Sequence, residues 1–224
     1  MFWRTIRAIL WKDITLERHT GQTISIMVFF SLAAVVTFNL ALVIDLSAAR
    51  NVSAGLLWVT ILLAGTLGLN RSFSVEHENN SFDALLMAPA DRGAIYLGKV
   101  ASIFTFTFLL ELILLLLFTV FFNRPFLRPA ALGLIALGSL GFVAAGVLVT
   151  AMTIQTRSKE VLLPILLLPL TLPAVLAASF ATAQLVFLDN PTWEDVGFAV
   201  SLVFLYDVLM LLAGFYTFRF VVEE

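Results

Sequence analysis

The segment Gly93-Ala-Ile-Tyr-Leu-Gly98-Lys99 comes nearest to a nucleotide-binding motif, because it matches the Gly-x4-Gly-Lys portion of a phosphate-binding loop. In such loops a Ser or Thr hydroxyl follows the lysine and binds Mg²⁺. Val100 occupies that position here, no buried strand precedes the segment, and a long apolar stretch follows it directly. We therefore expect no nucleotide binding by this chain, and we expect Lys99 to extend to the inner lipid headgroups.

Two acidic residues, Glu111 and Asp207, lie deep within apolar stretches. A charge at the centre of a bilayer costs at least about 2.5 kcal/mol, so an acid there is a functional candidate by default. Two interpretations stay open. Either both side chains are protonated or paired and serve helix packing, or they lie on a path for a substrate or a proton.

Other reactive side chains are scarce. The chain has no cysteine and only two histidines, His19 and His77. Disulfides, thiolate metal sites and covalent attachment of c-type haem are therefore excluded. No nucleophile, metal-binding cluster or acid pair indicates an intramembrane enzyme. We expect no catalytic residue in this chain, and no metal or cofactor bound by it.

The longest polar stretch, Arg71 to Ala94, contains the pattern of a short helix. Asn80 suits an N-cap, Asp83 follows it three residues later, and Pro89 ends the helix. Apolar and polar residues fall on separate faces, Phe82, Leu85 and Leu86 on one and Glu76, Asn80 and Asp83 on the other. The segment 76–89 is thus predicted to rest on the membrane and present polar groups.

The elements that position these residues are membrane helices. Of 224 residues, 61% are hydrophobic and 12% are charged, and the mean hydropathy is +1.02. A spanning helix needs about 20 apolar residues, because lipid offers the backbone no hydrogen-bond partner. We predict an all-α, polytopic membrane protein with one domain, 1–224. Its six spans are 22–44, 52–70, 95–122, 129–154, 161–187 and 196–220.

The distribution of Lys and Arg predicts the orientation. With a cytoplasmic amino terminus, ten of them lie on the cytoplasmic side and three, Arg50, Arg124 and Arg128, on the other. Basic loops of short length are poorly translocated, so this bias favours six spans with both termini in the cytoplasm. No cleavable signal peptide is recognised, since the basic start is not followed by a short apolar region with a cleavage site.

Residues 1–20 have the pattern of an amphipathic helix that lies in the inner membrane interface. Apolar residues share one face and basic residues another, although Asp13 falls on the apolar side. Trp3 and Trp11 suit the depth of the headgroups, and the basic side chains can reach anionic lipid. Gly21 then lets the chain turn into the first span.

The fifth span carries Pro164, Pro169 and Pro173. Each proline removes a backbone donor, so we expect this helix to bend and its freed carbonyl groups to need shelter in protein or water. Two interpretations are open: a packing kink, or a flexible element near the outer mouth of a dimer.

Two of these patterns resemble a known family. The run from Glu76 to Pro89, followed by Tyr96-Leu-Gly-Lys-Val100, resembles the coupling segment of ABC-2-type exporters. The proline-rich run Leu162 to Pro173 is similar to the fifth span of the CcmB family, the membrane subunit of the haem exporter of cytochrome c maturation. The family usually carries Gly-Ser-Leu-Glu in its coupling segment, where this chain has Asn80-Ser-Phe-Asp83.

The resemblance implies a permease of the bacterial inner membrane without catalytic residues. It implies a homodimer on two CcmA-like ATPase subunits, which bind ATP and Mg²⁺, with CcmC- and CcmD-like membrane subunits. A CcmE-like haem chaperone would be an indirect partner, haem would be handled by the wider complex, and no nucleic acid is involved. ATP hydrolysis would serve release of the loaded chaperone. The implied ATPase contacts are Glu76, Glu78, Ser81, Asp83 and Leu86.

Other functions remain possible on the sequence. One is an ion- or proton-coupled carrier that uses Glu111 and Asp207 and needs no ATPase. Another is an ABC-2 exporter of a different substrate. Transport by the purified chain alone distinguishes the carrier from both exporters.

Overall fold

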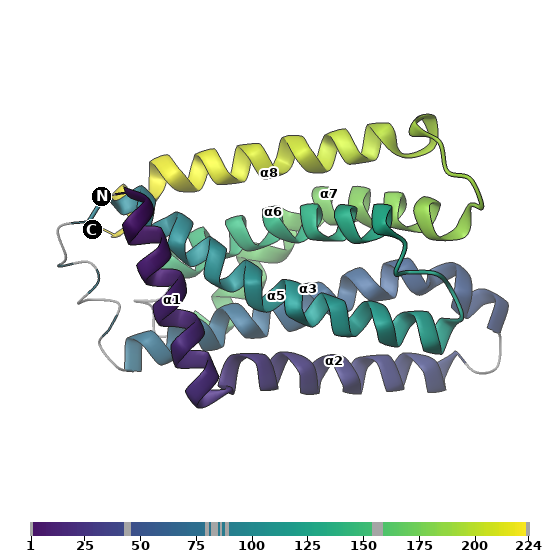
Figure 1. Cartoon of the computed structure of the whole chain (residues 1–224), viewed down its shortest axis with the longest axis horizontal. Helices are drawn as coiled ribbons and strands as arrows, with labels where there is room; N and C mark the ends of the chain where they lie inside the picture. Colours follow the sequence, from purple (N-terminus) through teal and green to yellow (C-terminus); the bar gives the residue numbers. More distant parts are fainter. Residues whose placement is uncertain are drawn as a thin grey trace.

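The computed structural model describes residues 2–42, 46–78, 81, 85, 87, 90–153 and 159–222. Within these ranges the chain forms seven helices and no strand (Figure 1). They are α1 (Phe2–Thr20), α2 (Gln22–Ala41), α3 (Leu46–Glu78), α5 (Arg92–Phe122), α6 (Pro129–Thr153), α7 (Lys159–Phe187) and α8 (Trp193–Val222).

Six of the helices are long and apolar enough to cross a membrane, as predicted: α2, α3, α5, α6, α7 and α8. The predicted second span ends at Asn70, whereas the helix α3 that contains it continues without a break to Glu78. Local hydropathy falls after Asn70, but Phe73 and Glu76 in the continuation are buried against neighbouring helices. Tertiary partners therefore extend a helix that hydropathy alone would end. The predicted ends 44 and 154 lie outside the described residues.

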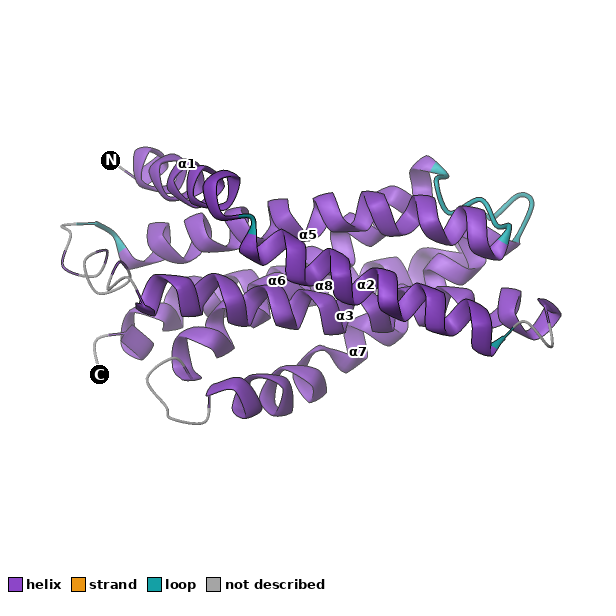
Figure 2. Ribbon diagram, turned by 90° about the horizontal axis from the view of Figure 1, so that it is seen from below, coloured by secondary structure: helices purple, strands orange, loops and turns teal. Residues whose placement is uncertain are grey.

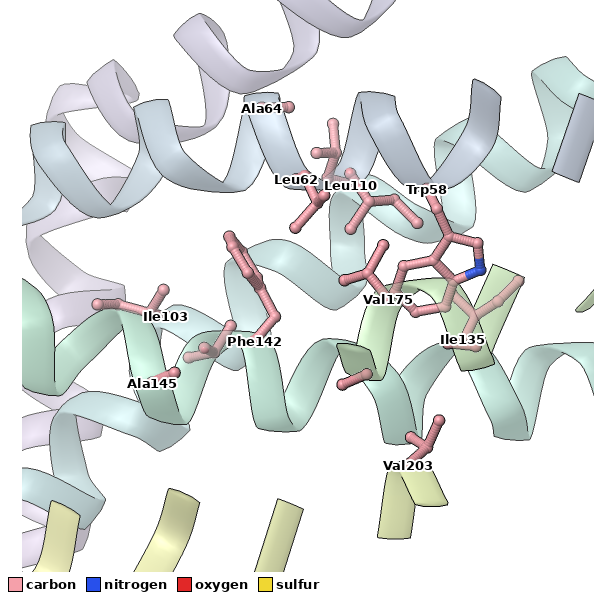
Figure 3. Close-up of a cluster of buried hydrophobic side chains, with 14 of the residues drawn as sticks. Trp58, Leu62, Ala64, Ile103, Leu110, Ile135, Phe142, Ala145, Val175 and Val203 are labelled. Atoms are coloured by element: carbon pink, nitrogen blue, oxygen red, sulfur yellow. The ribbon is translucent and has the colours of Figure 1, made fainter. Parts of the chain in front are cut away.

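The core gathers around α6, which packs against α3, α5, α7 and α8. Figure 3 shows Trp58 of α3 and Phe142 of α6 in this core. The Trp58 indole N–H also donates a hydrogen bond of 3.0 Å to the Thr182 hydroxyl on α7. A Cβ at Gly138 would lie 2.5 Å from the Trp58 ring, so only glycine lets α3 approach α6 this closely.

Helix α1 crosses one end of the bundle obliquely, and α8 ends at that same end (Figures 1 and 2). We call this the α1 end. Trp3 and Trp11 are exposed, at 74% and 70%, while Ile6 and Ile9 are buried against the bundle. Exposed aromatic side chains on the outer face and buried aliphatic side chains on the inner face fit a helix at the membrane interface.

Helix α2 is the least embedded of the six spans. Only Thr23, Met27, Ser31 and Val35 of its 20 residues are buried. Its main contacts are with α3 and α5. A span with so little buried surface is held to the bundle by few interactions.

Candidate functional site

Four charged side chains from three helices meet at the α1 end. The Lys99 ammonium of α5 lies 3.0 Å from Asp13 Oδ2 of α1 and 2.5 Å from Glu76 Oε2 of α3. Lys12 of α1 lies 3.1 Å from Asp13 Oδ1 and also donates to the Glu76 carboxylate. Each lysine thus contacts both carboxylates. We call these four residues the ion cluster.

The ion cluster is almost entirely enclosed. Lys99 is 0% exposed, Glu76 1% and Asp13 5%, while Lys12 is 38% exposed and connects the cluster to solvent. The Lys99 ammonium also lies 5.4 Å from the centre of the Phe73 ring, a cation–π distance. Two positive and two negative groups balance, which is the condition under which charges are tolerated inside a protein.

Local sequence brings α1 and α5 close enough for these contacts. The Asp91 carboxylate caps α5 by accepting hydrogen bonds from the backbone N–H groups of Gly93 and Ala94, at 2.8 and 3.3 Å. One residue before Lys99, Gly98 faces α1, and a Cβ there would lie 3.0 Å from the Ile9 Cβ. This close approach of the two helices lets the neighbouring lysine reach Asp13.

The cluster shifts the titration of its two α1 members. Burial raises the pKa of the Asp13 carboxyl, but attraction to Lys99 and Lys12 lowers it by more, so its pKa lies below the ordinary value. Burial lowers the pKa of the Lys12 ammonium, but Glu76 and Asp13 raise it by more, so its pKa lies above the ordinary value. Both shifts favour the charged forms over the neutral pH range.

A second carboxylate of α1, Glu17, joins α1 to α2. Its oxygens accept hydrogen bonds from the backbone N–H groups of Thr23, at 3.2 Å, and Ile24, at 2.7 Å. The N-cap of α2 is Gly21, which has no side chain to satisfy those donors and adopts a left-handed φ of 61°. Glu17 therefore does the work of an N-cap side chain from the preceding helix.

A cavity of about 540 Å³ lies between α2, α3 and α7. Ile26 and Phe30 of α2 and Leu168 of α7 form apolar parts of its lining, while Asn70 and Arg71 of α3 supply polar groups. Arg71 also donates a hydrogen bond to the Gln22 side chain at the start of α2. The cavity is therefore amphipathic.

The intramembrane acids Glu111 and Asp207 lie elsewhere, on α5 and α8. They are 0% and 2% exposed and form no ion pair within the described residues. The Ser139 side chain lies near the Glu111 carboxyl group, and the Gly141 backbone lies near the Asp207 carboxyl group. Asp207 packs closely on α6, since a Cβ at Gly141 would lie 2.1 Å from Asp207 Oδ1. Neither acid lines the cavity between α2, α3 and α7. Whether they serve packing or a pathway stays a prediction to test.

Comparison with known proteins decides the family. The sequence profile described as CcmB protein matches residues 4–216. The chain belongs to the CcmB family. Heme exporter protein B of Escherichia coli K12 is 32% identical over 189 residues, which cover 83% of this chain and 81% of that protein. Heme exporter protein B of Rhodobacter capsulatus is 29% identical over 174 residues, 76% of this chain and 79% of that protein.

The geometry of this CcmB-family chain corrects the prediction for Lys99. The sequence predicted a side chain extended to lipid headgroups, whereas Lys99 is fully buried and paired with two carboxylates. Its acid partners come from α1 and α3, which no local pattern places beside α5. The expectation that Gly93 to Lys99 is not a phosphate-binding loop agrees with the structure, because the whole segment is helical.

The predicted ATPase contacts have different positions in this CcmB-family chain. Glu76 was expected to be an exposed contact, but it is 1% exposed and lies within the ion cluster. Ser81 donates a hydrogen bond of 3.2 Å to the Glu76 carbonyl oxygen. Asp83, Leu86 and Pro89 lie outside the described residues, as does the side chain of Glu78. Residues 76–78 of the predicted helix 76–89 belong to the last turn of α3.

The three prolines of the CcmB-like run lie inside one helix, because α7 continues through Pro164, Pro169 and Pro173. Pro164 lines the cavity between α2, α3 and α7. The expected bend and its role stay predictions. No group of three or more potential metal ligands is found within the described residues.

Sequence reasoning missed three residues of the site: Lys12, Asp13 and Glu17. One signal was present, since Asp13 interrupts the apolar face of α1 and Glu17 follows it one turn later. Two acids on the buried face of an amphipathic helix indicate partners inside the protein. The sequence did not indicate which partners these are.

Proposed function

We propose that this chain is the membrane permease subunit of a haem export complex, driven by ATP hydrolysis in a separate subunit. Membership of the CcmB family, relatives named heme exporter protein B and six candidate membrane spans support this function. The observation that carries the mechanism is the ion cluster. It joins the end of α3 to the start of α5, and these two helices flank the polar segment 79–90.

The polar segment is the coupling segment of the permease. A force on the coupling segment is passed to the end of α3 at Glu78 and to the start of α5 at Arg92. Glu76 and Lys99 join these two helices in a buried ion pair. Separating such a pair leaves charges without compensation in a low-dielectric interior, so the two helix ends move together. A displacement of the segment therefore moves α3 and α5 together relative to the rest of the bundle.

The contacts with the ATPase are Glu78, Ser81, Asp83 and Leu86, with acidic groups facing a basic or amide surface. Glu76 acts from within, as a member of the ion cluster. The α1 end faces the cytoplasm of a bacterial inner membrane, because it carries most of the Lys and Arg residues. Further membrane subunits of the haem export complex cover part of the bundle.

Charge reversal in the coupling segment tests this function. We expect Asp83→Arg to reduce co-purification of the ATPase subunit about ten-fold or more, because it places a like charge against a basic surface. Glu194→Arg is the matched control, since Glu194 is exposed at the start of α8, away from the α1 end. Unchanged ATPase recovery with Asp83→Arg contradicts the proposal. Transport by the purified chain in liposomes without an ATPase contradicts it too.

A further inference from the structure

Two buried acids on α1 hold two different parts of the molecule. Asp13 contacts Lys99, which lies about two turns into α5, the helix that follows the coupling segment. Glu17, one turn later on the same face, binds the first turn of α2. Both side chains are at least nine-tenths buried, with 5% and 7% exposed. A single short stretch of α1 is thus fastened to the base of the coupling segment and to a membrane span.

The junction between α1 and α2 is tightly constrained. The Gly21 N–H donates a hydrogen bond of 2.6 Å to the Glu17 carbonyl oxygen, while the Glu17 carboxylate holds two N–H groups of α2. Only the one residue Gly21 separates the two helices. The Glu17 side chain therefore fixes the angle between α1 and α2, and motion of α1 is passed to α2.

Helix α2 is suited to be the part that moves. It is the span with the least buried surface, and Ile26 and Phe30 form its side of the cavity between α2, α3 and α7. The other sides belong to α3 and α7, and α7 packs against α6 and α8 in the core. A tilt of α2 therefore changes the width of this cavity while the core stays packed.

We propose that Asp13 and Glu17 are positioning residues through which α1 carries displacement of the coupling segment to α2, and so sets the opening of the cavity. This inference rests on the proposed function. The ion cluster makes α1 move with the ends of α3 and α5, and the Glu17 carboxylate makes α2 follow α1. Loss of Glu17 separates ATP hydrolysis from movement of α2 without removing the contact with the ATPase.

The first experiment measures haem delivered per ATP hydrolysed by the assembled complex in liposomes. Wild-type delivery must first depend on the ATPase, and failure at that step refutes the proposed function and this inference with it. We expect Glu17→Ala to lower the ratio about five-fold or more, a typical coupling effect. Glu17→Gln keeps an oxygen acceptor and recovers most of the ratio. If Glu17 has only a structural role, its substitution changes the amount or the melting temperature of the complex and leaves the ratio of haem delivered to ATP hydrolysed unchanged.

The second experiment observes α2 directly. The chain has no cysteine, so two introduced cysteines are the only sites in this chain that take spin labels. Phe29 of α2 and Ile165 of α7 are 77% and 59% exposed, which makes both positions accessible. We expect the distance between labels at Phe29→Cys and Ile165→Cys to change on ATP binding, and the change to vanish when Glu17→Ala is added. A change that persists in Glu17→Ala overturns the inference.

A third variant covers the case in which Glu17→Ala does not fold. Cysteines in place of Ile9 and Gly98 put their Cβ atoms about 3.0 Å apart, slightly closer than the 3.8 Å usual in a disulfide. Because α1 and α5 move as one body in this proposal, the oxidised pair delivers haem at the rate of the reduced pair. A loss of delivery on oxidation that reduction restores shows that α1 moves relative to α5, and overturns the inference.

Discussion

At the α1 end, Asp13 and Glu76 are about as deeply buried as Glu111 and Asp207 within the spans. The first two acids each contact two lysines, whereas the second two pair with no basic side chain among the described residues. Burial alone therefore does not define what an acid does in this protein. The partner decides: the paired acids are ions that join helices, whereas we expect the second pair to be neutral, because an unpaired charge within a span is costly.

This difference predicts opposite responses to similar substitutions. Removing a charge from the ion cluster leaves another charge buried without compensation. Removing the ionisable group from Glu111 leaves no charge behind, because a neutral acid and an amide are nearly the same in size and polarity. Three single variants and one double variant measure how far this contrast holds.

Lys99→Met has the largest expected effect. It leaves Asp13 and Glu76 with only the half-exposed Lys12 between them. Breaking a buried ion pair by removing one partner costs about 3–5 kcal/mol, so we expect this loss in the free energy of unfolding in detergent.

A matched double variant tests the cause of that loss. Glu76→Gln combined with Lys99→Met removes one charge of each sign and leaves the Lys12 and Asp13 pair. We expect it to recover more than half of the stability lost in Lys99→Met, because no uncompensated charge remains. A double variant less stable than Lys99→Met means that packing, and not charge balance, holds the site together.

Asp13→Asn has an intermediate effect of about 1–3 kcal/mol, since Lys99 keeps Glu76 and Lys12 can turn to solvent. The folded pKa of Asp13 is lowered, so its contribution is present above its unfolded pKa of about 3.9 and is lost as the pH falls through the folded value. The folded pKa of Lys12 is raised, so its contribution is lost only as the pH rises past about 10.4.

The stability difference between wild type and Asp13→Asn is therefore constant from about pH 5 to pH 9 and shrinks below about pH 4. Melting temperatures of both proteins across this range measure it. A difference that falls steadily between pH 5 and pH 8 is inconsistent with an ionised Asp13 in the folded protein.

Glu111→Gln has the smallest expected effect, below about 1 kcal/mol, because the amide fits the space of a neutral carboxyl group. Haem delivery by the assembled complex should stay within about two-fold of wild type. If delivery is lost while stability and assembly are unchanged, Glu111 lies on a proton or substrate path. The two pairs of acids then differ in function as well as in charge.

The candidate spans and the amphipathic helix α1 were predictable because their signals are local. A run of apolar residues must be helical in lipid, and in α1 the exposed Trp3 and Trp11 alternate with buried aliphatic residues at helical spacing. The end of α3 was not predictable in this way. Its last turns contain polar residues that hydropathy assigns to a loop, and they stay helical where Glu76 pairs with Lys12 and Lys99 of other helices.

The site was predictable only in part. The pattern of segment 76–89 located the junction between α3 and α5. Glu76, however, was predicted to be exposed and is buried. Glu17 had no assigned role in the sequence, because its function as a cap depends on Gly21 turning the chain so that α2 begins beside it.

The amino-acid sequence by itself determined the all-helical class, the six candidate spans and the position of the polar segment between α3 and α5, since these follow from apolar runs and charges that are close together in the chain. Only the tertiary structure decided which charges meet. Asp13 and Lys99 are 86 residues apart, and Lys12 and Glu76 are 64 apart. Electrostatic attraction depends on distance in space, and packing of α1 across α5 sets that distance.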